Sequence, residues 1–407
     1  MKVFLPRKSF FVPILISFGF AACVSAGSSG PSGQGGSGSA DAGSGGLTGS
    51  QSGGRSGSGS GGTTAGTGGM GGLGGSLATG GTSGTGGATS TAFTCPPGPF
   101  PSLQLPTTAP VRIPDAPPTV NDTFNNNGNN FTIVEGPVWI GDALYVSEIG
   151  SSSQPPPPSR VIKITATDAV TIAIPPDSGS NGLAVDRDGA LATANHGAGG
   201  IVKFNLTTGA RSTVIAQYNG SRFNSPNDLT IRSDGTIYFS DPAFQAPNPQ
   251  PQQGKTWVYM LPPNATTAMA VAQTLSNPNG VTLSLDEKTL YIGDGGGVRT
   301  FGVHTDGTLD ASGIPFGGTA FSSGATDGMA IDCAGNLYVV RVNSHDIVVL
   351  SPSGQMIGSP ITVPGGGQIT NSAFGGTDHK TLYITAMGTG TQRGVFKLAM
   401  PIPGMPY

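Results

Sequence analysis

A pattern that repeats about every 45 residues constrains the fold of this chain more than any other feature. Each repeat places one polar residue before two short apolar-alternating runs joined by a turn. The polar positions are Glu135, Asn181, Asn227, Asn279, Asp327 and Asn371, with separations of 46, 46, 52, 48 and 44 residues. In five of the six repeats a tyrosine follows 10–12 residues later. Periods of this length are typical of β-propeller blades, so the sequence predicts an all-β, six-bladed propeller.

The third repeat shows the expected strands most clearly. Its segment "SPNDLTIRSDGTIYFSD", Ser225 to Asp241, holds an Asp-Gly turn between two apolar-alternating runs, which is typical of a β-hairpin. We expect strands at residues 228–232, 236–241, 255–261 and 270–275. The innermost strand of a blade lines the central channel. Since the six polar residues lie where that strand begins, they should meet at one mouth of the channel.

The last repeat ends after "GVFKLAM" and has no fourth strand of its own. We expect an N-terminal segment to supply that strand and close the ring, which would leave no exposed sheet edge. The segment "NFTIV" before Glu135 is the predicted closing strand.

The first 94 residues differ in composition from the rest. Residues 1–22 combine basic residues with an apolar stretch, as a secretory signal peptide does. Cys23 follows two alanines, as in a bacterial lipoprotein cleavage site, and ordinary cleavage after Ala26 is the alternative. Residues 23–94 are rich in Gly, Ser and Thr and should form a disordered tether. We expect an exported protein, either an outer-membrane or cell-surface lipoprotein or a secreted or periplasmic protein, with its propeller at residues 95–407.

The charge balance and the cysteines limit the partners and the compartment. A net charge of −3 without a basic cluster argues against nucleic acid as a partner. A lipid anchor would be the only attachment to a membrane, and we expect a monomer. Cys95 and Cys333 can form a disulfide in an oxidising compartment or remain two free thiols, and the sequence leaves both open.

The chemistry of the six polar residues points to a cation. Carboxylate and amide oxygens gathered at one point suit a hard ion such as Ca²⁺, which accepts six to eight oxygen ligands. The four histidines are scattered and form no zinc-type cluster. The alternative is that each Asn or Asp caps a strand by bonding to local backbone.

Several motifs resemble one enzyme family. The segments "EGPVW", "SPNDL", "NPNG", "TDGMAID" and "KTLYIT" are similar, in this order, to those of the senescence marker protein/gluconolactonase/luciferin-regenerating-enzyme-like family of six-bladed calcium propellers. The resemblance implies that Glu135, Asn227, Asn279 and Asp327 bind a divalent metal, most simply Ca²⁺, with Zn²⁺, Mn²⁺ or Mg²⁺ as alternatives. Asn181 and Asn371 would then lie beside the metal ligands.

The same resemblance implies a lactonase, a carboxylic ester hydrolase that opens a small-molecule lactone or ester. The metal would polarise the ester carbonyl, and Asp327 would accept a proton from water as general base. Asp327 could instead be a ligand alone. His196 could carry protons near the substrate or be an ordinary loop histidine, and Asp241 could touch substrate or only shape its loop.

One position departs from the family. Sugar lactonases often carry an Arg two residues before the third-blade Asn, where this chain has Ser225. Arg222 or Arg341 could replace that arginine. The Pro/Gln-rich loop at residues 242–254 could be a lid or a tolerated insertion.

Two other functions fit the same fold. One is a non-enzymatic surface propeller that binds glycan or protein and uses calcium structurally. The other is a phosphotriesterase-like hydrolase, since a metal would equally polarise a phosphoryl oxygen.

Overall fold

The computed structural model describes residues 93–114, 131–150, 156–175, 178–247, 251, 253–322 and 325–406. The predicted signal peptide, the lipidation site at Cys23 and nearly all of the predicted tether lie outside the described residues. No helix within the described ranges is long and apolar enough to cross a membrane.

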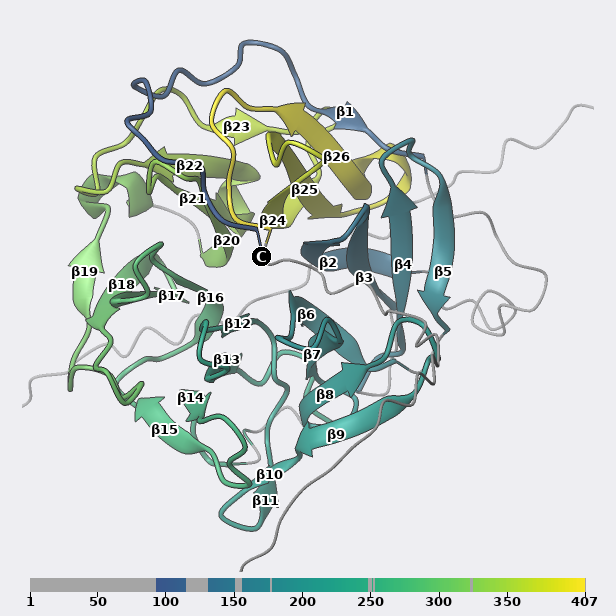
Figure 1. Ribbon diagram of the computed structural model, residues 1–407, viewed down its shortest axis with the longest axis vertical. Coiled ribbons are helices and arrows are strands. Elements are labelled where there is room, and N and C mark those ends of the chain that lie inside the picture. The colour runs from purple at the N-terminus through teal and green to yellow at the C-terminus, as the bar shows by residue number, and fades with distance from the viewer. Residues whose placement is uncertain are drawn as a thin grey trace, which may run out of the picture. The chain divides into compact units, whose positions relative to one another are not determined.

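Six antiparallel sheets of four strands surround one axis, which confirms the six-bladed propeller (Figure 1). The inner strands of blades 1 to 6 are β2 (Phe131–Ile140), β6 (Ser180–Val185), β12 (Leu229–Ile231), β16 (Pro278–Leu283), β20 (Thr326–Ile331) and β24 (Gln368–Gly375). The second strands are β3 (Ala143–Gly150), β7 (Leu191–Asn195), β13 (Ile237–Asp241), β17 (Thr289–Asp294), β21 (Leu337–Arg341) and β25 (Thr381–Met387). Each inner strand contacts the inner strands of both neighbouring blades, so the ring is closed.

The remaining strands lie farther from the axis. The third strands are β4 (Ser159–Thr165), β8 (Gly200–Phe204), β14 (Trp257–Leu261), β18 (Gly297–Gly302), β22 (Asp346–Leu350) and β26 (Gly394–Ala399). The outer strands are β5 (Val170–Ile174), β9 (Arg211–Ile215), β15 (Met269–Ala272), β19 (Ile314–Phe316), β23 (Ile361–Thr362) and β1 (Val111–Arg112). A short hairpin, β10 (Gln217–Tyr218) and β11 (Ser221–Arg222), precedes blade 3, and single 3₁₀ turns occur at η2 (Gly318–Phe321), η3 (Val342–Ser344) and η4 (Gly390–Gln392).

An N-terminal strand closes the ring, as expected, but it is not the predicted one. In blade 6, β1 pairs with β26 through Val111 opposite Lys397 and Arg112 opposite Phe396. The predicted closing segment before Glu135 instead begins β2, the inner strand of blade 1. The physical reason is the length of β2, which runs without a break through the polar position at Glu135 and leaves the edge of β26 to an earlier segment.

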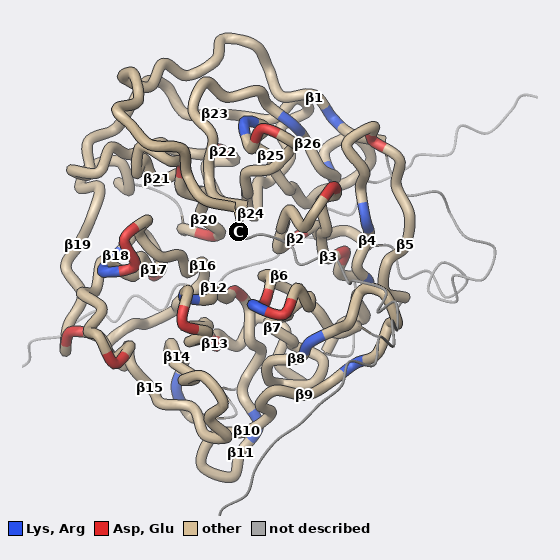
Figure 2. Tube along the Cα trace, in the orientation of Figure 1, with Lys and Arg blue, Asp and Glu red and all other residues tan. Residues whose placement is uncertain are grey.

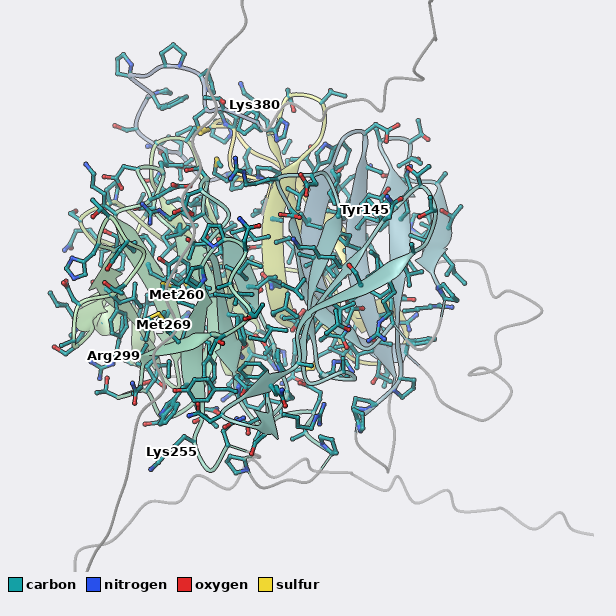
Figure 3. All side chains as sticks on the ribbon, turned by 60° about the horizontal axis from the view of Figure 1, so that its bottom comes forward. Tyr145, Lys255, Met260, Met269, Arg299 and Lys380 are labelled. Carbon is teal, nitrogen blue, oxygen red and sulfur yellow. A yellow bond between two sulfur atoms is a disulfide. The ribbon has the colours of Figure 1, made fainter. Side chains whose placement is uncertain are left out.

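Burial falls from the axis outward within each blade. In blade 3, Met260 on β14 is 1% exposed, whereas its cross-strand partner Met269 on the outer strand β15 is 45% exposed. The two side chains lie close together in Figure 3. The outer strand therefore contributes less buried apolar surface than the strands inside it.

The tyrosine that recurs in the sequence packs between its own blade and the next one. Tyr238 of blade 3, for example, is buried against Val281 and Leu290 of blade 4. Ala192 occupies the equivalent place in blade 2, which lacks the tyrosine, and packs against blade 3. The tyrosine position of the repeat therefore marks a packing contact between neighbouring blades.

The C-terminal segment closes the end of the channel opposite the polar residues. The chain end lies at the centre of the propeller in Figure 1. Met405 donates its backbone N–H to Ile331 at the end of β20 (3.0 Å), and the carbonyl of Pro406 accepts from Trp139 near the end of β2 (3.0 Å). These bonds join the tail to the downstream ends of inner strands, so the polar residues of the repeat lie toward the opposite end.

A disulfide fastens the start of the domain to blade 5. Cys95 and Cys333 are bonded, so of the two possibilities left by the sequence the structure contains the paired form. The backbone N–H of Cys333 donates to Pro403 (2.7 Å), and the Phe93 ring stacks on His379 of blade 6. The N-terminal segment, the tail and blades 5 and 6 therefore form one cross-linked region.

Candidate metal and substrate site

The six polar residues of the repeat, here called the ring residues, lie in the upstream halves of the inner strands or just before them. Five belong to the strands themselves, and Asn227 lies two residues before β12. Five are nearly buried, with exposed fractions of 7% for Glu135, 1% for Asn181, 6% for Asn227, 8% for Asp327 and 6% for Asn371. Asn279 is partly buried. These low exposures fit side chains that line a narrow channel.

A β-bulge accompanies five of the ring residues. The pairing between inner and second strand shifts register between Glu135 and Val138, and equivalent shifts occur in blades 2, 4, 5 and 6. A bulge removes a residue from the regular ladder and redirects its side chain. In blade 3, β12 begins after Asn227, which has the same effect. In blades 2, 4 and 5 the bulge therefore takes the ring residue out of the ladder. Glu135 and Asn371 lie beside a bulge but stay paired, with Ser147 and Thr385 respectively.

Glycines after the ring residues let neighbouring blades approach closely. A Cβ on Gly182 would lie 2.7 Å from the carbonyl oxygen of Asn227, and one on Gly136 or Gly280 would overlap the backbone of the next ring residue. A Cβ on Gly328 would overlap the Asn371 side chain. Since no larger residue fits these places, the polar-Gly pair is the sequence signal of close approach between successive ring residues.

Blade 3 has an aspartate where four blades have this glycine. Asp228 is 8% exposed, and its Oδ2 accepts the backbone N–H of Val281 in blade 4 (3.1 Å). Its Oδ1 accepts the N–H of Leu229 (3.0 Å). Asp228 is thus a third buried carboxylate at the ring, absent from the sequence-based set. The signal that could have found it is the Asp of "SPNDL" in a position that is Gly in most repeats.

The carboxylates of the ring destabilise one another's charge. Burial raises the pKa of Asp327 to about 8, with the charge of Asp228 adding to the effect. Burial also raises the pKa of Asp228 to about 7. The pKa of Glu135 is well above its usual value because of burial and the nearby Asp327 and Asp228. Glu135 and Asp327 are therefore close together, and a cation between such groups would favour their ionised forms.

The amides of the ring orient the carboxylates and leave oxygens free. The side-chain amides of Asn371 and Asn279 lower the pKa of Glu135 and Asp327 respectively, so each amide lies beside a carboxyl group. The Oδ1 atoms of Asn181 and Asn279 are buried without a hydrogen-bond partner among the described residues. A buried polar atom without a partner is costly, so these two oxygens have room for an electropositive ligand.

The residues present fit a hard cation. Within the described ranges, no group of three or more His, Cys, Asp or Glu side chains is arranged to hold a metal by itself. A cation held beside Glu135 and Asp327 would therefore need amide oxygens as further ligands. Mixed carboxylate and amide oxygens are the donors that Ca²⁺ and Mg²⁺ prefer, and zinc sites favour His and Cys.

His196 is buried away from solvent. Its exposed fraction is 0%, and its Nε2 lies 2.9 Å from the carbonyl oxygen of Pro157. Arg222 donates from Nη2 to the carbonyl of His196 (2.9 Å). Burial lowers the pKa of His196 to about 4. No contact between His196 and a ring residue occurs among the described residues, and its buried place in the structure suits a packing role.

Other polar residues considered from the sequence make structural contacts. Arg341 donates to both carboxylate oxygens of Asp346 (2.8 and 2.7 Å). Asp241 accepts the backbone N–H groups of Asn224 (2.9 Å) and Ser225 (3.0 Å), so it shapes the segment before Asn227. Arg222, as noted, bonds to backbone carbonyls of blade 2. Each of these contacts accounts for the residue without substrate.

Charges of both signs are spread over the blades. Figure 2 shows Lys and Arg interspersed with Asp and Glu along the described part of the chain.

The comparison with known protein families decides the relationship. Residues 133–388 match the family described as the SMP-30/gluconolactonase/LRE-like region. The chain belongs to this family. The matched residues start just before Glu135 and extend beyond Asn371, so they include every ring residue.

Individual members of the SMP-30/gluconolactonase/LRE-like family are similar over much of their length. A gluconolactonase from Zymomonas mobilis is 32% identical over 284 residues, which are 62% of this chain and 75% of that protein. The solved structure of a gluconolactonase from Xanthomonas campestris is 27% identical, with a TM-score of 0.57, over 67% of this chain and 87% of that one. Regucalcin from Agrobacterium tumefaciens, a calcium-binding protein, is 18% identical with a TM-score of 0.54 over 68% and 92% of the two chains, and shows the shared fold. The resemblance expected from the motifs is confirmed.

Proposed function

We propose that this protein is a divalent-metal-dependent hydrolase that opens lactones. The observation that carries the proposal is the ring itself, where three buried carboxylates and two unpartnered amide oxygens meet at one mouth of the channel. The similar proteins named as gluconolactonases support a lactonase-type enzyme. The proposed substrate is a small lactone or related ester.

Four ring residues would hold the metal. The two carboxylates would come from Glu135 and Asp327. An amide oxygen would come from Asn279, whose Oδ1 has no partner among the described residues. Asn227 lies on blade 3, next to the blade of Asn279. When bound, a divalent cation such as Ca²⁺ polarises a carbonyl oxygen and stabilises the negative charge that develops there. Asn181 and Asn371 lie on either side of Glu135 around the ring and would border the substrate.

Asp327 is the proposed general base. The Asn279 amide fixes its carboxyl group. As a water oxygen adds to the ester carbonyl carbon, Asp327 accepts the proton of that water. It returns a proton to the ring oxygen as the C–O bond breaks, and the product is an open-chain hydroxy acid. General base catalysis of this kind contributes about 10²–10⁴-fold to the rate.

Asp228 is the competing candidate for this proton transfer. Both of its oxygens accept backbone N–H groups, which hold the carboxylate in place and offset part of the rise in its pKa that burial causes. We therefore assign Asp228 to the electrostatics of the ring, where its charge strengthens the attraction for a cation.

Metal removal and single substitutions test the proposal. Protein from which a chelator has removed the metal should no longer open lactones, as measured by pH-stat titration. It should regain this activity when Ca²⁺ is added. Asp327→Asn, which keeps the shape of the side chain, should lower kcat by about 10²-fold or more with an unchanged circular dichroism spectrum. Full activity in protein shown by mass spectrometry to be metal-free would refute the metal requirement, and full activity of Asp327→Asn would remove this residue as base.

The location of the enzyme is proposed from its sequence. The signal-like residues 1–22 and the lipoprotein-like Cys23 support export and a lipid anchor, with the tether separating anchor and propeller. We expect the mature protein to act as a monomer on substrates outside the cytoplasm. Fractionation of cells and metabolic labelling with a fatty acid would test both points.

A further inference from the structure

A side chain from blade 3 reaches the ring residue of blade 2. Gln245 lies in the loop that follows β13, and its Oε1 accepts a hydrogen bond from Nδ2 of Asn181 at 3.4 Å. Asn181 is 1% exposed, whereas Gln245 is only partly buried. Gln245 therefore borders the mouth at the point where a molecule entering the channel would meet the ring.

The backbone of this loop is fixed where it carries Gln245. Ser225 donates from its hydroxyl to the carbonyl of Pro242 (2.8 Å) and accepts the backbone N–H of Gln245 (3.2 Å). Ser225 is fully buried and also donates its backbone N–H to Asp241 (3.0 Å). A long arginine side chain, which many sugar lactonases have at the position of Ser225, could not make these short-range bonds. The serine at position 225 therefore helps to place Gln245 at the ring.

The contact with Asn181 determines which atoms remain available. Gln245 uses Oε1 for Asn181, and its Nε2 donates to no described residue. Asn181 uses Nδ2, and its Oδ1 stays buried without a partner among the described residues. The Nε2 group of Gln245 is therefore a neutral N–H donor just outside the ring. Arg222 and Arg341 bond to His196 and Asp346 instead.

We propose that Gln245 determines substrate specificity at the mouth by donating an Nε2 hydrogen bond to an oxygen substituent on the lactone ring. The proposal rests on the proposed lactonase function. A neutral donor selects hydroxylated lactones over bare ones without requiring a negative charge on the substrate.

The expected effect is that of one neutral hydrogen bond. Such a bond contributes about 1 kcal/mol, so its loss should lower kcat/KM by about five- to tenfold. The loss should be confined to substrates that carry the oxygen substituent. A change in the ratio of two substrates is the signature, because damage to the ring itself would affect both equally.

The test compares D-glucono-δ-lactone with δ-valerolactone, which has the same ring and no hydroxyls. Gln245→Ala should lower kcat/KM about five- to tenfold for the hydroxylated lactone and leave the other within about twofold. The matched control is Gln253→Ala. Gln253 holds the far end of the same loop through Nε2 bonds to Tyr218 (3.1 Å), Ser221 (2.7 Å) and Arg222 (2.9 Å). Equal losses on both substrates, no loss, or the same selective loss in Gln253→Ala would overturn the assignment.

A binding measurement separates this inference from the proposed activity. 1,5-Anhydro-D-glucitol keeps the ring hydroxyls and has no ester, so titration calorimetry can follow its binding whether or not the protein hydrolyses lactones. Wild-type protein should bind it about five- to tenfold more tightly than Gln245→Ala. Equal affinities, or no binding by either protein, would refute the role of Gln245. If wild-type protein binds this ligand selectively yet opens neither lactone, the proposed function fails while the role of Gln245 stands.

Discussion

At the scale of single residues, the site depends on which side chain follows each ring residue. Gly136, Gly182, Gly280 and Gly328 allow the next blade to come within contact distance, and Asp228 takes the same place in blade 3. This explains the Asn-Asp pair of "SPNDL". Asn227 is the ring residue, and Asp228 adds a buried charge and a hydrogen bond to blade 4. The repeat therefore sets both the shape and the charge of the channel mouth.

The glycine at position 328 gives a sharp test of this packing. In Gly328→Ala the new methyl group would overlap the side chain of Asn371 and displace it from Glu135. We expect a loss of about 1–3 kcal/mol in unfolding free energy, the usual cost of overpacking, and weaker Ca²⁺ binding by calorimetry. Gly297→Ala is the matched control, since its methyl group would find its nearest neighbour at 4.0 Å. Equal stability and Ca²⁺ affinity for the two variants would contradict the close approach.

Buried His196 predicts how stability depends on pH. Its pKa is about 4 in the folded protein and about 6.5 in the unfolded chain, so the unfolded chain binds the proton more readily between these values. The contribution to stability is complete above pH 6.5 and is lost as the pH falls from 6.5 through 4. It amounts to about 3 kcal/mol at most.

Urea unfolding at pH 7 and pH 4.5 measures this contribution. His196→Gln keeps a hydrogen-bond donor and cannot titrate, so its loss of stability between the two pH values should be smaller than that of the wild type by about 2–3 kcal/mol. Other titrating groups contribute equally to both proteins and cancel in the comparison. Identical pH dependence would show that His196 accepts a proton in the folded state.

At the scale of elements, short strands and bulges decide the geometry. A two-residue strand, β1, completes blade 6, and bulges in the inner strands of blades 2, 4 and 5 take Asn181, Asn279 and Asp327 out of the ladder. The sequence anticipated the strands of blade 3 to within three residues because apolar alternation and the Asp-Gly turn are local signals. It assigned the closing strand wrongly, because a two-residue pairing across the whole domain has no local signal.

Removal of β1 should open the ring. Deletion of residues 1–114 removes β1 and Cys95 and leaves the edge of β26 unpaired, whereas deletion of residues 1–92 keeps both. We expect the shorter deletion to unfold cooperatively in calorimetry and the longer one to aggregate or to lose a cooperative transition. A cooperative transition at the same temperature in both proteins would show that β1 is dispensable.

At the scale of the whole molecule, closure comes from contacts between distant parts of the chain. The inner strands touch in a complete circle, the tail spans blades 1, 5 and 6 at the far end of the channel, and the disulfide joins residues separated by 238 positions. The tail therefore lies at the end of the inner strands opposite the ring residues.

The disulfide should stabilise the domain by restricting its unfolded chain. For a loop of 238 residues, the chain-entropy estimate is about 5 kcal/mol. The double variant Cys95→Ser/Cys333→Ser should therefore melt on the order of 5–10 °C lower than the wild type in scanning calorimetry. Reductant should lower the Tm of the wild type and leave the double variant unchanged. An unaltered Tm in the double variant would mean that the N-terminal segment is held by β1 and packing alone.

The sequence by itself determined the number of blades, the positions of the ring residues and the family. The reason is that the repeat occurs once per blade, and its motifs carry both the ring residues and the resemblance to the family. Tertiary structure alone decided the third carboxylate at Asp228, the contact of Gln245 with Asn181, the pairing of Cys95 with Cys333 and the closing strand at residues 111–112. Each of these depends on two segments far apart in the chain meeting in space. The free energy of such a contact depends on burial and geometry that no local pattern of residues records.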